Sequence, residues 1–437
     1  MPFKEVNPRQ NFPEMERGWV AHWKKHKTFE KSVESRPKDK EFVFYDGPPF
    51  ATGLPHYGHI LAGTMKDVVP RYQTMRGHRV ERVFGWDCHG LPIENLIEKD
   101  LDLKTKKDIE EKFGIAKFNE ACRASVLKYT NEWEDIVSRM GRWIDFKNDY
   151  KTMDPEYMES IWWVFKELWN KDMIYQGRKA MHICPRCVTP LSNFEVTLGY
   201  QDVTDQSVTC KFRLDSAPKG QGDGDYYVLA WTTTPWTLPG NMYLAIGEDI
   251  SYGIYKTKEG PELLILAENL AETMFGETEY ELVKSIKADD LIDITYEPLF
   301  PYFKGLKKEG KFRIKTANFV EDSDGTGVVH IAGGYGEDDM ELCKKFGERD
   351  SSDVIQHVGI DGVLVPEVTD FAGEDVKPKD DGMKTDKKIV KWLEENGKVF
   401  TAATYKHSYP HCWRCDSPLL NYTTSAWVVS IRSKNKC

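Results

Sequence analysis

Two Cys-x-x-Cys pairs carry the strongest chemical signal in the sequence. Cys184 and Cys187 form the first pair, and Cys412 and Cys415 form the second. Each pair can present two thiolates to one ion, and four thiolates complete the tetrahedron that structural zinc prefers. Similar phrases follow the two pairs, VTPLSN and DSPLLN, which favours two halves of one ribbon over the alternative of redox-active dithiols. The sequence therefore predicts one structural Zn²⁺ bound by four sulfurs.

A second candidate site brings two histidines and two glycines together at the expected start of a helix: Gly53, His56, Gly58 and His59. Imidazoles three residues apart lie on one helix face, beside N–H groups that have no partner in the first turn. The helix dipole and the absence of a Cβ on glycine suit the close approach of a phosphate. Surface or core histidines without chemistry are the alternative when these residues are taken alone.

The elements that must hold these histidines follow a strand, helix, strand order. Residues 41–45 (EFVFY) predict a short buried strand, a helix begins near His56, and residues 80–84 (VERVF) predict a second strand. Pro70 should kink this helix and Gly77 should end it. Two strands joined through a helix must be parallel, so the order predicts an α/β fold with a doubly wound parallel sheet.

In the rest of the chain the expected secondary structure changes from helical to β-rich and then to a charged stretch. Residues 106–178 predict helices with a buried tryptophan stripe, made of Trp133, Trp143, Trp162, Trp163 and Trp169. From about residue 196 to 370 the pattern predicts a β-rich domain that begins with a hairpin. An exposed charged stretch (373–388) and a short helix from Asp386 to Asn396 should follow. Because the two cysteine pairs flank this region and would share one ion, we expect it to be an inserted domain.

Composition sets broad limits on function. Of 437 residues, 30% are charged and 40% hydrophobic, with a formal net charge of −10. No apolar run approaches the roughly 18 residues that cross a bilayer, so we expect no membrane partner. The amino terminus shows no secretory signal, which makes the cytoplasm the expected compartment. Net negative charge argues against non-specific coating of nucleic acid, so any RNA contact should be local.

The motifs together resemble those of the class I aminoacyl-tRNA synthetases. PPFATGLPHYGH (48–59) resembles the family signature, and GWDCHGLPIE (85–94) is similar to its isoleucine-specific branch. The resemblance implies a Rossmann-like catalytic domain of the HUP type that activates isoleucine with ATP and Mg²⁺ and then charges tRNA(Ile). His56 and His59 would bind ATP and stabilise the transition state.

The resemblance also implies an amino-acid pocket. Asp87 would hold the α-ammonium group of the substrate, a sensible pairing in a sheltered cleft. The pocket would be lined by Gly47, Pro48, Pro49 and Trp86. A turn residue after a strand is the alternative for Asp87.

A hydrolytic editing site is implied by two further motifs. WTTTPW supplies Thr232, Thr233 and Thr234 at a strand end, and GTGVVHIAGGYGEDD supplies His330 and Asp339. By resemblance, Asp339 would anchor the α-amino group, Thr233 and His330 would limit side-chain size, and neighbouring hydroxyls would position water. A plain strand surface is the alternative for the threonines. The family usually has proline shortly after this histidine, whereas glycines here predict a mobile wall.

These motifs give the expected domain plan of an amino-terminal fragment that acts as a monomer. Residues 1–180 form the first half of the catalytic domain, 181–195 and 405–420 the zinc ribbon, 196–400 the inserted editing domain, known as CP1, and 421–437 re-enter the catalytic domain. A Lys-Met-Ser-Lys-Ser type of loop and an anticodon-binding domain are not found. Alternatives are a stand-alone aminoacyl-tRNA deacylase, a synthetase for another branched-chain amino acid, and a non-catalytic zinc-ribbon RNA-binding module.

Overall fold

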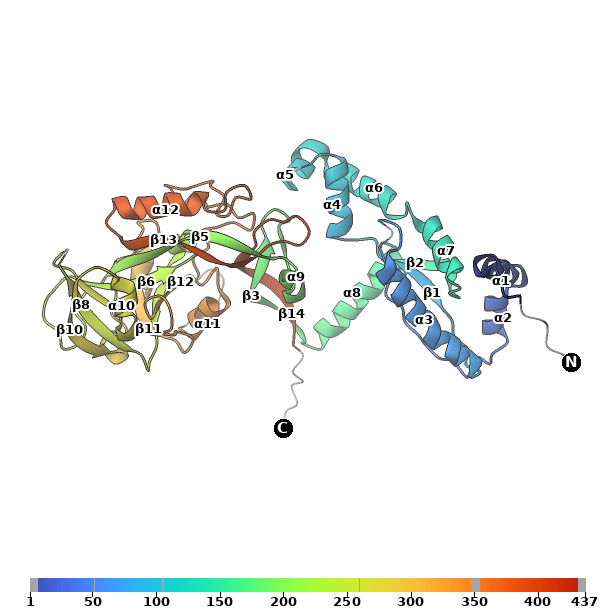
Figure 1. The fold of residues 1–437 in the computed structure, drawn as a ribbon, viewed down its shortest axis with the longest axis horizontal. Coiled ribbons are helices and arrows are strands. Elements are labelled where there is room, and N and C mark those ends of the chain that lie inside the picture. Colours follow the sequence, from blue (N-terminus) through green and yellow to red (C-terminus); the bar gives the residue numbers. More distant parts are fainter. Residues whose placement is uncertain (1–6, 51, 104–105, 259, 347–353, 431–437) are drawn as a thin grey trace. The chain divides into compact units, whose positions relative to one another are not determined.

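The chain divides into two compact units at the Met173–Ile174 junction. The computed structural model, shown in Figure 1, describes residues 7–50, 52–103, 106–258, 260–346 and 354–430. The end of the expected re-entry segment, residues 431–437, and residue 51 of the family signature lie outside the described residues. Within the described parts of the chain, none of the helices is long and apolar enough to cross a membrane.

Unit 1 is built mainly from helices around one short parallel sheet. Its helices are α1 (Phe12–His26), α2 (Thr28–Glu34), α3 (Tyr57–Met75), α4 (Leu91–Asp100), α5 (Lys106–Asp108), the π-helix η1 (Ile109–Phe113), α6 (Ile115–Val126), α7 (Thr130–Arg139) and α8 (Pro155–Asn170). Strands β1 (Val83–Trp86) and β2 (Asp145–Lys151) pair in parallel.

Helix α3 begins and ends where the sequence predicts. His56 is its N-cap, with an extended backbone and a side chain that accepts the Gly58 N–H. Gly77, just past the C-cap Arg76, adopts φ +90°, a left-handed conformation that glycine reaches without steric cost. His56 therefore lies at the amino-terminal end of α3, next to the N–H groups of its first turn.

The strands around α3 differ from the prediction. Residues 41–45 are not a buried strand: they make one isolated parallel bridge, Glu41 to Arg79, and Val43 is 61% exposed. The second strand starts at Val83 instead of residue 80, and its partner β2 lies in a region predicted to be helical. The predicted parallel pair of 41–45 with 80–84 is therefore wrong. In the described part of unit 1 the parallel sheet has two strands, β1 and β2, and the charged residues of β2 concealed a half-buried extended segment.

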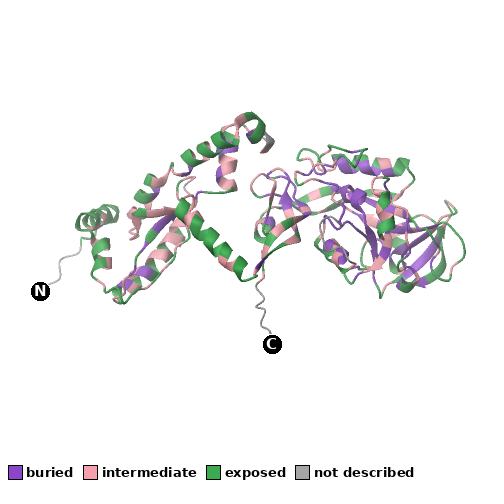
Figure 2. Ribbon diagram, turned by 180° about the vertical axis from the view of Figure 1, so that it is seen from behind, coloured by how far each residue is buried: buried purple, intermediate pink, exposed green. Residues whose placement is uncertain are grey.

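The expected tryptophan stripe is wrong for α8. Trp133 is 4% exposed and packs with Phe84 and Trp86 in the core of unit 1. Trp162, at 72% exposed, and Trp163, at 62%, lie on the surface of α8, which is exposed along most of its length (Figure 2). The helical spacing was correct, but spacing alone cannot tell which apolar faces find a partner.

Unit 2 consists of three sheets with short helices. Its strands are β3 (Ile174–Cys184), β4 (Thr189–Pro190), β5 (Tyr200–Arg213), β6 (Tyr226–Thr232), β7 (Tyr243–Ile246), β8 (Ser251–Thr257), β9 (Leu263–Ala267), β10 (Tyr280–Lys287), β11 (Arg313–Thr316), β12 (Val328–Ile331), β13 (Val399–Pro410) and β14 (Leu420–Val429). Its helices are α9 (Asn193–Thr197), α10 (Ala271–Phe275), α11 (Glu337–Lys345) and α12 (Lys384–Glu395), with 3₁₀ segments η2 (Pro235–Gly240), η3 (Glu268–Leu270), η4 (Ala288–Asp290) and η5 (Lys304–Glu309).

The sheets bring distant parts of unit 2 together. One sheet has the order β10-β8-β9-β6-β5-β13, a second β11-β7-β12, and a third β14-β3-β4. The predicted hairpin of β5 and β6 is confirmed as an antiparallel pair. The first and last strands of the unit, β3 and β14, pair antiparallel over ten residues, so the segments that flank the β-rich region lie side by side.

The predicted exposed stretch at 373–388 is wrong in its centre. Val376, Lys377, Thr385 and Asp386 are all buried, with Lys377 at 3% and Asp386 at 0% exposure. The predicted helix follows as α12, two residues earlier than expected, with Gly397 in a left-handed conformation after the C-cap Asn396. Burial of these charges is possible because they pair with each other.

Candidate functional site

The two signature histidines cap α3 reciprocally. His56 Nδ1 accepts the Gly58 N–H at 3.1 Å, and His59 Nδ1 accepts the His56 N–H at 3.3 Å. Their rings stack with centroids 3.7 Å apart. Since both Nδ1 atoms accept hydrogen bonds, the tautomer that fits this arrangement carries its proton on Nε2 in each ring. Burial, followed by the nearby His56 and Lys66, lowers the pKa of His59, which favours the same form.

A cleft of about 400 Å³ opens beside this helix end within unit 1. His59 and Asp87 both line it, together with Gly47, Pro48 and Pro49. The Asp87 N–H donates to the carbonyl of Pro49 at 2.9 Å, which joins the loop before α3 to the end of β1. Of the predicted ATP-binding residues, His59 thus lies at the same cleft as Asp87, Gly47, Pro48 and Pro49, whereas His56, Gly53 and Gly58 are not among the residues that line it.

Trp86 differs from its predicted neighbours in the pocket. Its side chain is 1% exposed in the core of unit 1, and its Nε1–H donates to Asp149 at 2.7 Å. Side-chain contact with a substrate in the cleft is therefore not supported. Gly53 makes a contact of a different kind: its carbonyl accepts a hydrogen bond from Trp133 Nε1–H at 2.8 Å.

Three cleft residues were missed by the sequence reasoning. Asp46 forms ion pairs with Lys66 and Arg142 at the cleft wall. Lys66 Nζ also donates to the carbonyl of Gly47 at 3.1 Å. Asp46 directly precedes the signature, and Lys66 lies on the same helix as the histidines, but only the fold reveals that Arg142 joins them.

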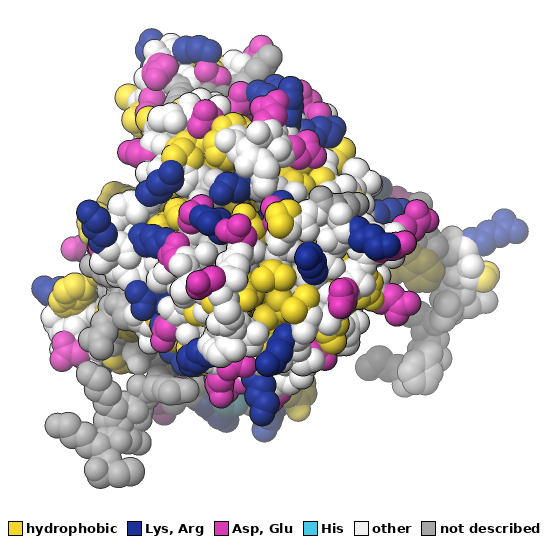
Figure 3. Space-filling view, turned by 90° about the vertical axis from the view of Figure 1, so that its left-hand side faces the viewer, with side chains coloured by type: hydrophobic (Ala, Val, Ile, Leu, Met, Phe, Trp, Pro, Cys, Tyr) yellow, Lys and Arg dark blue, Asp and Glu magenta, His cyan; other side chains and the backbone are white. Residues whose placement is uncertain are grey.

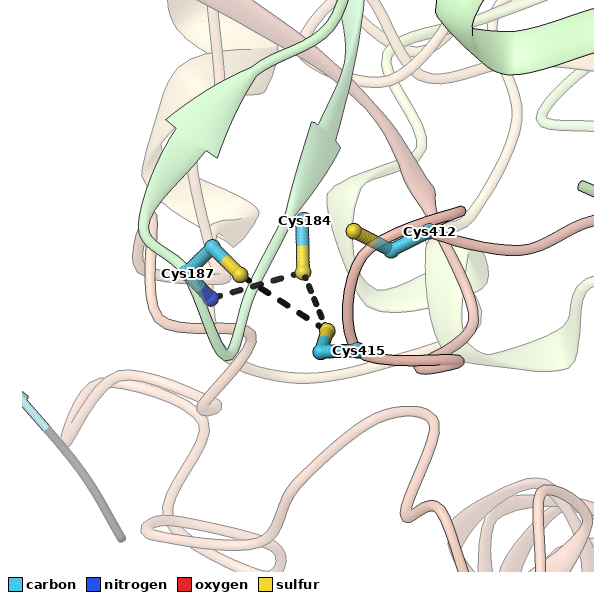
Figure 4. A group of neighbouring side chains, drawn as sticks. All are labelled: Cys184, Cys187, Cys412 and Cys415. Atoms are coloured by element: carbon cyan, nitrogen blue, oxygen red, sulfur yellow. Dashed lines mark hydrogen bonds between the residues drawn. The ribbon is translucent and has the colours of Figure 1, made fainter. Parts of the chain in front are cut away.

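The four cysteines come together in unit 2 from two segments, 184–187 and 412–415. Their sulfurs all lie within 4.8 Å of one another, and Cys415 Sγ is 3.4 Å from Cys184 Sγ and 3.6 Å from Cys187 Sγ. Figure 4 shows the side chains turned toward a common centre. Sulfurs around one tetrahedral zinc are about 3.8 Å apart, given Zn–S bonds of about 2.3 Å. The donor set and spacing therefore fit one zinc ion.

The threonine motif connects to His330 through a chain of hydrogen bonds. Thr232 Oγ1 and Thr234 Oγ1 are 3.2 Å apart, and Thr234 Oγ1 is 3.4 Å from Thr237 Oγ1. Thr237 Oγ1 lies 2.8 Å from His330 Nε2. Thr233 lies between the first two and is partly exposed. The structure thus brings Thr232, Thr234 and His330 into one network through Thr237, which the sequence reasoning missed.

His330 is a neutral ring with a defined tautomer. Asn241 Nδ2 donates to the carbonyl of Tyr243 and lies 3.3 Å from His330 Nδ1, so Nδ1 accepts and Nε2 donates to Thr237. Burial, followed by the nearby His357, lowers the pKa of His330 to about 3. This histidine is therefore a buried hydrogen-bond donor, and it is too weak a base to take a proton near neutral pH.

Asp339 lies in the first turn of α11, close to the end of β12. Burial raises its pKa to about 7, while a hydrogen bond from the Ala332 backbone opposes the shift and neighbouring Asp338 adds to it. The residue as a whole is half-buried. Besides the hydrogen bond from the Ala332 backbone, a carboxylate has further acceptor positions that could pair with an ammonium group.

The wall after His330 is packed. Gly333 and Gly334 are buried, and a Cβ on them would lie 2.7 Å from Cys343 Sγ and 2.9 Å from the carbonyl of Ile355. The Thr423 N–H donates to the carbonyl of Gly334 at 2.7 Å. The glycines therefore allow close packing, which argues against the predicted mobile wall.

Comparison with known proteins shows the class to which the chain belongs. Residues 18–436 match the family model for tRNA synthetases class I (I, L, M and V). Because the match covers nearly the whole chain, the chain belongs to this family of synthetases.

Several curated relatives of the chain are named for the same amino acid, isoleucine. The chain is 46% identical, over 98% of its length, to an isoleucine–tRNA ligase of Treponema denticola. It is 43% identical to that of Treponema pallidum and 44% to that of Bdellovibrio bacteriovorus, again over 98% of its length. The chain spans about 40% of the length of these relatives.

A search of solved structures gave a match to a structure described as the crystal structure of GlLeuRS-CP1. It has a TM-score of 0.36 and 18% sequence identity, and it covers 45% of this chain and 98% of that one.

Proposed function

We propose that this chain supplies the nucleotide and amino-acid sites of an isoleucine–tRNA ligase, in which ATP and isoleucine give isoleucyl-adenylate before transfer to tRNA(Ile). The observation that carries the proposal is the cleft that His59, Asp87 and the Gly47–Pro49 loop line together. The relatives are named isoleucine–tRNA ligases, which supports isoleucine as the amino acid.

The chemistry assigned to this cleft is binding and charge stabilisation. The Nε2–H groups of His56 and His59, together with the first turn of α3, offer donors to phosphate oxygens as the isoleucine carboxylate attacks the α-phosphorus and pyrophosphate leaves. Asp87 pairs with the substrate ammonium, and Thr152 Oγ1, 3.3 Å from Asp87 Oδ1, orients that carboxylate. ATP is expected to enter as its Mg²⁺ complex.

A second proposed activity is hydrolysis of mischarged Val-tRNA(Ile) in unit 2. Isoleucine and valine, the standard case of such discrimination, differ by one methylene, worth only about 1–3 kcal/mol in an apolar pocket. The network of Thr232, Thr234, Thr237 and His330, with Asp339 nearby along the chain, supports a separate hydrolytic site. Asp339 would bind the α-ammonium group, and Thr233 and His330 would limit the side chain.

The cysteine cluster is proposed as a structural Zn²⁺ site at the base of the inserted region. Cys184 and Cys187 lie at the end of β3 and in the turn after it, and Cys412 and Cys415 follow β13. Zinc would therefore join the entry and exit of the β-rich region, as the proposed division into catalytic, ribbon and editing domains requires. We also propose that the chain acts as a monomer in the cytoplasm.

Contact with tRNA should be local on this chain. Basic and acidic side chains are interspersed over the face shown in Figure 3, in keeping with the net charge of −10. A mixed surface gives little non-specific attraction to phosphates, so recognition would depend on defined contacts.

The test is hydrolysis of Val-tRNA(Ile) and Ile-tRNA(Ile) by the purified chain, beside Thr233→Ala and Asp339→Ala variants. We expect loss of the valyl ester with the isoleucyl ester spared, abolished by Asp339→Ala. Thr233→Ala should enlarge the site and increase hydrolysis of the isoleucyl ester. Asp338→Ala is the matched control, because Asp338 is an exposed neighbour on the same helix turn.

The outcome also separates the two proposed activities. If both esters survive at high protein concentration, the editing proposal is wrong for this chain. ATP binding by the unmodified chain, weakened in His59→Ala, would then decide the activation proposal independently.

A further inference from the structure

The peptide groups of Trp236 are held from two sides by buried ionisable side chains. The Trp236 N–H donates to Asp386 Oδ1 at 2.9 Å, and the Trp236 carbonyl accepts from His357 Nε2 at 2.8 Å. Asp386 and His357 are both 0% exposed. Asp386 is 150 residues and His357 121 residues away along the chain, so these contacts are set entirely by the tertiary fold.

The segment around Trp236 needs such support. It forms η2, a 3₁₀ helix with poorer hydrogen-bond geometry than an α-helix, and Pro235 and Pro239 contribute no N–H group. The Trp236 N–H lies in its first turn, where a donor has no partner within the helix. Asp386 supplies that partner. The His357 ring also lies against Gly240, where a Cβ would approach His357 Nδ1 to 2.3 Å.

Asp386 can remain a buried acceptor because Lys377 pairs with it. Lys377 Nζ lies 3.0 Å from Asp386 Oδ2 and 2.8 Å from Asp205 Oδ1, and all three side chains are buried. Asp205 also accepts from His407 Nε2 at 3.1 Å. The cluster joins α12, the loop before it, β5 and β13. One Asp386 oxygen is thus neutralised by lysine, which leaves the other for the Trp236 peptide.

Trp236, whose peptide groups bond to Asp386 and His357, lies in the sequence between two threonines of the proposed hydrolytic site. Thr234 and Thr237 flank it at two residues before and one after, and Thr237 Oγ1 contacts His330 at 2.8 Å. A change at the Trp236 peptide would therefore move the hydroxyls relative to His330. Displacements of about 1 Å in a positioned site can cost about a hundredfold in rate.

We propose that Asp386, neutralised by Lys377, and His357 are positioning residues that hold the Trp236 peptide and thereby set the geometry of Thr234 and Thr237 for selective deacylation. This inference rests on the proposed hydrolytic function of unit 2. It assigns a role in discrimination to residues outside the threonine, histidine and aspartate motifs.

The experiment compares Asp386→Ala, Asp386→Asn and Leu393→Ala in the full chain. Leu393 is a fully buried residue two turns further along α12 and offers no polar group, so its variant controls for lost stability. Amide hydrogen exchange of residues 234–240 measures how firmly the two hydrogen bonds to Trp236 hold this segment. The ratio of valyl-ester to isoleucyl-ester hydrolysis measures selectivity. Lys377 keeps Asp205 as a partner in each Asp386 variant, so the fold should survive.

We expect Asp386→Ala to speed exchange of 234–240 and to reduce the selectivity ratio, each by about tenfold, the scale of one hydrogen bond to a charged group. Asp386→Asn should restore only part of both values, because its amide oxygen can still accept from Trp236 while its NH2 group replaces the oxygen that accepts from Lys377. Leu393→Ala should leave the selectivity ratio unchanged.

Three other results would overturn the inference. Equal changes in Asp386→Ala and Leu393→Ala at matched loss of stability would show a purely structural role. Faster exchange with an unchanged ratio, while Asp339→Ala still abolishes hydrolysis, would refute the positioning role and leave the hydrolytic function standing. Absence of hydrolysis by the unmodified chain would overturn the hydrolytic function, and this inference with it.

Discussion

Histidine side chains serve two different purposes in the two units. In unit 1, His56 and His59 direct their Nδ1 atoms to backbone N–H groups and leave both Nε2–H groups as donors at a helix start. In unit 2, His330 uses both nitrogens within the protein, between Asn241 and Thr237. The first arrangement suits a phosphate ligand, and the second suits a rigid wall.

Replacing His59 with alanine should weaken ATP binding by about tenfold or more, because one phosphate donor and the reciprocal cap of α3 are lost together. His59→Gln should recover part of the affinity by restoring an N–H donor. Quenching of tryptophan fluorescence is a suitable readout, since Trp133 lies 4.9 Å from His59 between ring centroids. His22→Ala, on α1, is the control and should bind ATP normally.

Asp339 should make valyl-ester hydrolysis depend on pH. The carboxylate form binds the ammonium group and its pKa is raised to about 7, so the catalysed rate should rise between pH 6 and 8. In Asp339→Asn the rate should be low and lack this step. The measurement is a pH–rate profile with spontaneous ester hydrolysis subtracted, and a flat profile for the unmodified chain would contradict the assignment.

The same shift has a consequence for stability. A carboxyl group whose pKa rises on folding stabilises the fold below its ordinary pKa, and that contribution is lost as pH rises through about 7. Asp339→Asn should therefore melt at a higher temperature than the unmodified chain at pH 8. The difference should shrink toward pH 5, and thermal unfolding at both pH values checks it.

At the scale of elements, the cysteine cluster joins segments that are far apart in sequence. β3 ends at Cys184 and pairs with β14, while β13 leads directly into the second cysteine pair. The cluster lies where these strands meet, so metal binding would close the entry and the exit of unit 2 in one place.

We expect the chain to bind one zinc ion and to lose about 5 °C or more of thermal midpoint on chelation, because the ion binds only the folded arrangement. Cys184→Ser and Cys412→Ser should each abolish stoichiometric binding. Cys122→Ser, in unit 1 and distant from the cluster in sequence, should keep it. Elemental analysis with matched melting curves gives the answer, and full zinc content in Cys412→Ser would contradict the shared site.

At the scale of the whole molecule, the two units divide the proposed chemistry between them. The cleft at His59 and Asp87 is built from residues of unit 1, and the cysteine cluster and the network of Thr232, Thr234, Thr237 and His330 are built from residues of unit 2. All strands of the three sheets of unit 2 come from residues after Met173.

Residues 174–430 produced alone should therefore fold, bind zinc and hydrolyse the valyl ester. A shorter piece, residues 174–396, should not fold, because it lacks β13 and β14, which pair with β5 and β3. Circular dichroism melting curves and zinc content distinguish the two pieces. Cooperative unfolding of the shorter piece would show that these strands are dispensable.

Some features of this protein follow from local sequence alone. The start of α3 directly after the N-cap His56, its end before Gly77 and the hairpin of β5 and β6 depend on residues near one another in the sequence. The family motifs are short contiguous segments, so they can be recognised from the sequence without the fold. The same holds for the spacing within each cysteine pair.

Other features depend on the tertiary structure. The meeting of the four sulfurs, the Arg142 contact with Asp46 and the Asp386 contact with Trp236 join residues 96 to 231 positions apart. Burial of Lys377 and exposure of Trp162 contradict their residue types for the same reason. A local pattern determines which side chains share one face of a helix or strand. Only the tertiary structure determines whether another element packs against that face and buries it.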